Sequence, residues 1–168
     1  MRLLAAMAII AAVPLTAGAQ QRMNMPAMNM EESKSAAPYH PGLGELMTAL
    51  VQPRHTKLGL AGAAGNWAYA AYALGELRET FDDVARLVLK HGNLVIGPAI
   101  AATVNPALAA LDKAIKAKDA AAFETAYGQL TDGCNACHKS ADHAMIVIQA
   151  PSAAGAAPFP DQNFDPPK

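Results

Sequence analysis

The chain has 168 residues, of which 52% are hydrophobic, 16% charged and 5% aromatic, and its formal net charge is −1. This length favours one domain with a core of its own, and so small a charge gives no general attraction to nucleic acid or to an anionic membrane. Aromatic residues are scarce and alanine is abundant, which favours packed helices over strands. The predicted fold class is therefore all-α.

The first 19 residues have the pattern of an export signal. Arg2 gives a positive start, residues 3–15 (LLAAMAIIAAVPL) are apolar, and AGA at 17–19 fits the small-x-small cleavage pattern. The apolar run is shorter than the ~20 residues that a membrane helix needs. We therefore expect cleavage near Ala19 and export to a bacterial periplasm, an oxidising compartment, with no membrane segment in the mature chain.

Residues 20–41 contain three prolines and no apolar period, which predicts a flexible leader. Within it, the stretch MNMPAMNM at 23–30 is rich in thioethers, which are soft ligands that select Cu(I). This stretch has two interpretations: it captures copper, or it is part of a leader whose composition is merely biased. The candidate copper ligands are Met23, Met25, Met28 and Met30.

The first predicted helix has an apolar face that begins with Leu43, Met47 and Leu50. Pro53 interrupts this pattern or restarts it. Downstream, glycines recur every third residue between good helix formers, which favours close approach to another helix or to a cofactor over a loose linker. These glycines are Gly59, Gly62 and Gly65.

Two further helices follow in the pattern. The second ends at HGN (91–93), where glycine is a common helix stop, and its apolar face carries Leu74, Leu77, Phe81, Val84 and Val88. The third has Asn105 as its candidate cap and Pro106 in its first turn. Pro98 is expected to open an earlier turn of the same helix, whose apolar face carries Leu108, Leu111 and Ile115.

The last predicted helix is the clearest and covers residues 120–139, with Asp119 as its cap. Its apolar stripe ends in both cysteines of the chain and consists of Phe123, Tyr127, Leu130, Cys134 and Cys137. Four helical stretches with short connections predict an antiparallel four-helix bundle over residues 42–149. Residues 150–168 are rich in proline and are expected to form an irregular tail.

The two cysteines belong to the sequence CNACH, in which His138 follows Cys137 directly. A disulfide would close a very small loop, a thioredoxin-type pair belongs in a βαβ context, and structural zinc normally needs four ligands. Covalent haem needs two thiols for two vinyl groups and an adjacent imidazole for the iron, which is what CxxCH supplies. The sequence therefore favours one covalent haem c on Cys134 and Cys137, with His138 as an axial ligand.

A helical bundle with CxxCH near the end of its last helix resembles the cytochrome c′ and cytochrome c-556 family, over roughly residues 43–140. The resemblance implies a periplasmic bundle with haem between its first and last helices, and electron transfer or gas binding as its function. It also implies a methionine or a non-ligating leucine at the distal position, which Met47 matches. This sequence departs from the family pattern in two ways. It lacks the arginine that members usually carry one turn before the distal residue, where Leu43 stands, and it has extra segments at both ends.

Met47 is the leading candidate for the sixth iron ligand, because antiparallel first and last helices would bring it beside His138. His55 is the alternative, and lies eight residues on, ~12 Å along a helix axis. His91, in a glycine-containing turn, is expected at the surface. An open sixth position is the third alternative.

The predicted function is single-electron transfer by a c-type cytochrome that is not an enzyme, with unidentified redox proteins as partners and a homodimer as one expected form. The alternatives are a five-coordinate haem protein that binds NO or CO, and a copper-handling protein that uses the leader. No nucleic acid or membrane partner is expected for the mature chain.

Overall fold

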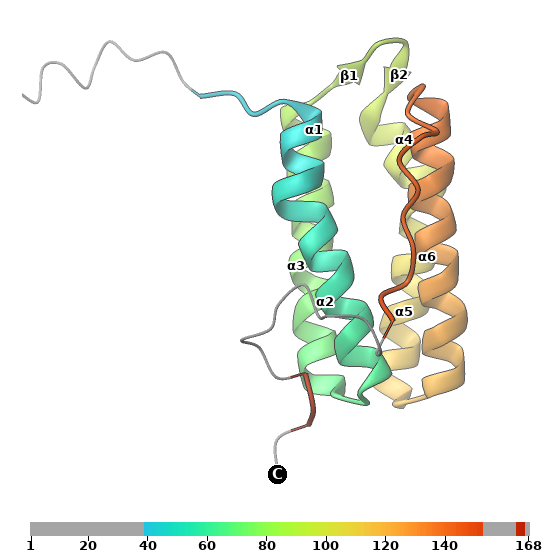
Figure 1. The fold of residues 1–168 in the computed structure, drawn as a ribbon. Helices are drawn as coiled ribbons and strands as arrows, with labels where there is room; N and C mark the ends of the chain where they lie inside the picture. Colours follow the sequence, from blue (N-terminus) through green and yellow to red (C-terminus); the bar gives the residue numbers. More distant parts are fainter. Residues whose placement is uncertain (1–38, 153–163, 167–168) are drawn as a thin grey trace, which may run out of the picture. The chain divides into compact units, whose positions relative to one another are not determined.

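The computed structural model describes residues 39–152 and 164–166, and these residues are mostly helical (Figure 1). The predicted signal (1–19), the leader up to residue 38 with its methionines, and residues 153–163 and 167–168 of the predicted tail lie outside the described residues. The helical elements are α1 (Leu43–Leu46), the π-helix η2 (Met47–Val51), α2 (Gln52–Ala63), α3 (Trp67–Leu87), α4 (Ile96–Thr103), α5 (Asn105–Ala117) and α6 (Ala120–Ser140).

The long helices pack side by side around one core. Helix α2 contacts α3 and α6, α5 contacts α3 and α6, and the short α4 lies against α3 and α6. The core has one fully buried leucine from each long helix, namely Leu58, Leu77, Leu111 and Leu130. In Figure 1, the start of α1 and the end of α6 lie at the same end of the helices.

Pro53 does not break the first helical stretch. The chain stays helical from α1 through α2, and the turn before Pro53 widens so that the Gln52 amide donates to the Met47 carbonyl, five residues back. A proline inside a helix lacks an N–H and crowds the carbonyl four residues before it, which the wider turn accommodates. Such π-turns are frequent at functional sites, and this one contains Met47.

Two of the three recurring glycines mark a close approach of helices, as the sequence predicted. A side chain at Gly62 would overlap the ring of Phe123, and one at Gly59 would overlap the ring of Tyr127, so α2 rests directly on aromatic rings of α6. The third glycine, Gly65, has φ +68° and belongs to the turn that ends α2. Glycine adopts this left-handed conformation without steric cost.

The predicted cap of the last helix is confirmed, because the Asp119 side chain accepts a hydrogen bond from the Ala122 amide. The predicted Asn105 cap is wrong. Asn105 is the first residue of α5, and Val104 before it has helical angles, because α4 runs into α5 with only this one residue between them. An N-cap residue normally has an extended backbone. Pro106 lies in the first turn of α5 as predicted, whereas Pro98 belongs to the separate helix α4.

The second helix ends earlier than the sequence indicated. Helix α3 stops at Leu87, and HGN lies in a small antiparallel hairpin of β1 (Lys90–His91) and β2 (Leu94–Val95), with Gly92 and Asn93 as its turn. Gly92, with φ +57°, supplies the left-handed residue that the turn needs. This hairpin carries His91 to the end of the structure where α1 begins and α6 ends (Figure 1).

Candidate functional site

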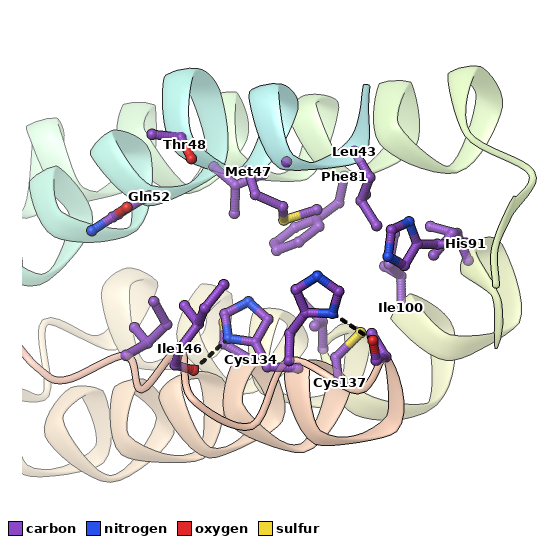
Figure 2. Close-up of a pocket in the computed structure, with 18 of the residues that line it drawn as sticks. Leu43, Met47, Thr48, Gln52, Phe81, His91, Ile100, Cys134, Cys137 and Ile146 are labelled. Carbon is purple, nitrogen blue, oxygen red and sulfur yellow. Dashed lines mark hydrogen bonds between the residues drawn. The ribbon is translucent and has the colours of Figure 1, made fainter. Parts of the chain in front are cut away.

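A pocket lies between the first helical stretch and the end of α6, with an empty space of about 1050 Å³ counted out to its open mouth. The glycine contacts hold α2 and α6 together further along, and the pocket occupies the region beyond them. One wall carries Met47 of η2, and the facing wall carries Cys134 and Cys137 of α6 (Figure 2).

The pocket is lined mostly by apolar side chains from elements far apart in the sequence. Phe81 comes from α3, Ile100 from α4 and Val104 from the α4–α5 junction, and these residues were not identified from the sequence as site residues. Each of them is buried. Their apolar character was visible in the sequence, but it fits an ordinary core equally well.

The helix α6 places Cys134, Cys137 and His138 together, since residues three and four apart share a helix face, and all three line the pocket. The cysteines are not bonded to each other. Burial raises the pKa of the Cys134 thiol to about 12, with the nearby Cys137 adding to the effect, and burial also raises the pKa of Cys137. Reactive or metal-binding cysteines normally have a lowered pKa, so this environment does not favour a redox pair.

The side chain of His138 is already held at one nitrogen. Its Nδ1 lies 2.9 Å from the carbonyl oxygen of Ile146. A carbonyl can only accept, so Nδ1 carries the proton and Nε2 of the neutral ring keeps a free lone pair. Histidines that bind metals characteristically donate their other ring N–H in this way.

The chain reverses direction directly after α6. Asp142 has φ +62°, the His143 amide donates to the His138 carbonyl, and the Asp142 amide donates to the Lys139 carbonyl. This is the Schellman pattern of helix ends. Residues 142–152, which we call the strap, then run back along α6 (Figure 1), and Ile146 and Ile148 of the strap line the pocket.

The two candidate distal ligands differ in their surroundings. Met47 is half-buried and extends from its helix toward the wall that carries Cys134 and Cys137 (Figure 2). His55 also lines the pocket, but its Nδ1 lies 3.0 Å from the Tyr127 hydroxyl and its Nε2 lies 3.1 Å from Thr131 Oγ1. Metal binding by His55 would break one of these buried hydrogen bonds, so the geometry favours Met47.

Two further histidines lie at the pocket. The rings of His91 and His143 contact each other edge to face, with centroids 5.1 Å apart, and both line the pocket. The sequence interpretation placed His91 at the surface, whereas the structure has it half-buried. Within residues 39–152 and 164–166, no group of three or more histidine, cysteine or acidic side chains is arranged to hold a metal ion.

The described helices include none that is long and apolar enough to cross a membrane. In the comparisons with known proteins, no family model, curated protein or solved structure matches the chain. The resemblance to the cytochrome c′ family therefore rests on the CxxCH motif and the helical pattern, and it stays a prediction.

Proposed function

We propose that the protein is a periplasmic c-type cytochrome that carries single electrons and is not an enzyme. In this proposal the fold is an antiparallel four-helix bundle, one haem is bound covalently through Cys134 and Cys137, and the iron is bound by His138. One observation carries the proposal: both cysteines and His138 line one apolar pocket, with Met47 on the wall that faces the cysteines.

The residues present fit a haem. The two thiols are free and lie one helical turn apart on the pocket side of α6. The imidazole of His138 has its Nδ1 hydrogen bonded, which leaves Nε2 for the iron. Apolar side chains such as Phe81 and Ile100 supply the contacts that a porphyrin face needs.

A bound haem would supply an iron that gains and loses one electron, and the chain's own residues would set the conditions for that change. The cysteines fix the position of the group, and the apolar walls exclude water from it. The thioether of Met47, as sixth ligand, would favour the ferrous state and raise the potential relative to two histidine ligands. A filled sixth position suits electron transfer, so Met47 also favours this function over gas binding.

The gas-binding function remains the alternative if Met47 only packs in the pocket wall and the sixth position is open. Periplasmic location, redox partner proteins and a homodimer belong to the same proposal, and they rest on the export pattern and on the family resemblance. Copper handling by Met23, Met25, Met28 and Met30 is independent of the pocket and depends on the leader alone.

The experiment is to express the full chain with its signal in a bacterium that has a haem-attachment system, and to extract the pure protein with acid–acetone. We expect the colour to stay with the protein and the mass to rise by one haem. Cys134→Ala and Cys137→Ala should each impair attachment, whereas Ser140→Ala, an exposed change on the same helix, should not. Haem that is extracted completely, or a protein without haem, would contradict the proposal.

A further inference from the structure

We infer that Asn135 is a positioning residue which, by holding the strap, fixes the imidazole of His138. The inference rests on the proposed function, because it concerns the histidine that would bind the iron. Asn135 is the first of the two residues between the cysteines of CNACH. The haem motif therefore contains both the proposed ligand and the residue that orients it.

Asn135 holds the strap at two points on one residue. Its Nδ2 donates to the Ile148 carbonyl at 2.9 Å, and its Oδ1 accepts from the Ile148 amide at 2.7 Å. A side-chain amide has a donor and an acceptor side by side in one plane, so it pairs with a backbone residue as a neighbouring strand would. This pairing fixes both the position and the direction of the strap.

The other contact is the hydrogen bond from His138 Nδ1 to the Ile146 carbonyl. Ile146 and Ile148 are separated by one residue, so the Asn135 pairing restricts where the Ile146 carbonyl can lie. Side-chain packing does little to hold this part of the strap, because Met145, Ile146 and Val147 are 78%, 45% and 64% exposed. Hydrogen bonds therefore position the carbonyl that holds His138.

Further along, the strap meets α2. A side chain at Gly59 would collide with the ring of Pro151 as well as with Tyr127, so the strap closes over the junction between α2 and α6. Asn135 is thus the link between the packed end of the strap at Pro151 and the turn at Asp142. Without it, the intervening residues have the freedom to move away from α6.

A backbone acceptor at Nδ1 makes an imidazole a stronger donor to a metal and fixes its ring orientation. A more basic ligand stabilises ferric iron over ferrous iron. Release of the strap should therefore shift the equilibrium toward the ferrous state. Outer-shell changes typically alter metal affinity or activity by 10–100-fold, and a shift at the lower end, about tenfold, is about 59 mV for a one-electron couple.

The test compares Asn135→Ala with Ser140→Ala in the full chain. The Ser140 hydroxyl donates a hydrogen bond to the Ala136 carbonyl of its own helix, so Ser140→Ala removes a hydrogen bond from the surface of α6 without touching the strap. Three quantities are measured: amide exchange at Ile148, the tautomer of His138 from ¹⁵N shifts of its ring, and the reduction potential. The first two are also measured in haem-free protein.

In the wild type we expect a protected Ile148 amide and an Nδ1-protonated His138. In Asn135→Ala we expect fast exchange at Ile148, a mixture of tautomers at His138 and a higher potential, with Ser140→Ala unchanged in all three. Asn135→Asp keeps the acceptor for the Ile148 amide, so it should keep much of the amide protection.

Fast exchange at Ile148 in Asn135→Ala, with the tautomer and the potential equal to those of Ser140→Ala, would overturn the inference. An unprotected Ile148 amide in the wild type would overturn it as well. If no haem is attached, the proposed function fails, and the tautomer measured in the haem-free protein still decides whether Asn135 positions His138.

Discussion

The Tyr127 hydroxyl of α6 lies 3.0 Å from Nδ1 of His55 and 2.8 Å from the His55 carbonyl oxygen on α2. Thr131, one turn further along α6, lies 3.1 Å from the other ring nitrogen. A histidine on one helix thus has both nitrogens engaged by hydroxyl groups of the facing helix. Because His55 also lines the pocket, this network joins α2 to α6 at the pocket wall through one buried imidazole.

Because His55 is only 3% exposed, the stability of the protein should depend on its protonation state. Burial lowers the pKa of His55 from 6.5 to about 4. Between these values the unfolded chain binds a proton that the folded chain does not, so stability should fall as the pH is lowered through this window. This pKa shift corresponds to a loss of about 3 kcal/mol at most in the free energy of unfolding.

The measurement is the free energy of unfolding by urea at several pH values between 4 and 7. The variant His55→Gln should be less stable at pH 7 but should lose much of the pH dependence in this window. His40→Gln, which changes an exposed histidine, should keep the wild-type slope. An equal slope in wild type and His55→Gln would show that His55 is not the group responsible.

Met47→Ala should open the sixth iron position. The oxidised wild type is expected to be low-spin, with the long-wavelength charge-transfer band typical of methionine ligation, and slow to bind CO after reduction. The variant should lose the band, bind CO at once and have a lower potential, because the thioether favours ferrous iron. Visible spectra of both oxidation states, with and without CO, provide the measurement.

Two control variants separate the candidate ligands. Met145→Ala removes a methionine that is 78% exposed, and it should behave as wild type. His55→Gln should keep the charge-transfer band. A high-spin wild type that binds CO immediately would mean that Met47 only packs in the wall and would favour gas binding. A low-spin wild type without the band, in which only His55→Gln opens the iron to CO, would identify His55 as the ligand.

Gly62→Ala should destabilise the fold by about 1–3 kcal/mol, since the new methyl group would overlap the Phe123 ring and push α2 away from α6. Gly128→Ala is the matched control, because it lies within α6 with no neighbour near the added Cβ. That change should instead stabilise the protein by about 0.5–1 kcal/mol through helix propensity. Urea denaturation at pH 7 measures both, and equal effects of the two changes would refute the close contact.

Deletion of residues 20–32, downstream of the predicted cleavage site, should leave the haem content and the melting temperature unchanged if the leader is only a spacer. Titration of the full chain with Cu(I) should then show no high-affinity site. Tight binding that disappears when Met23, Met25, Met28 and Met30 are replaced by isoleucine would support the copper-handling alternative, since only soft thioether ligands are removed.

Several features of the fold followed from local sequence. The Asp119 cap, the apolar stripe of α6 and the spacing of the glycines that allow a close approach depend on residues within one or two helical turns, where spacing determines which side chains share a face. The contacts of Gly59 and Gly62 with the rings of Tyr127 and Phe123 were decided by the packing of α2 against α6. The mostly helical fold was predictable for the same reason. The end of α3 was mistaken because HGN serves equally well as a helix stop and as a hairpin turn, and only the pairing of Lys90 with Val95 distinguishes them.

The candidate site likewise has a part that local sequence predicts and a part that depends on the tertiary structure. The sequence by itself determined the CxxCH unit, because Cys134, Cys137 and His138 lie within one helical turn and their chemistry does not depend on distant residues. Only the tertiary structure decided that Met47 faces them, that both His55 nitrogens are already hydrogen bonded, and that the strap returns to hold His138. Such contacts join residues far apart in the chain, and their geometry depends on how the helices pack and where they separate, which no local pattern records.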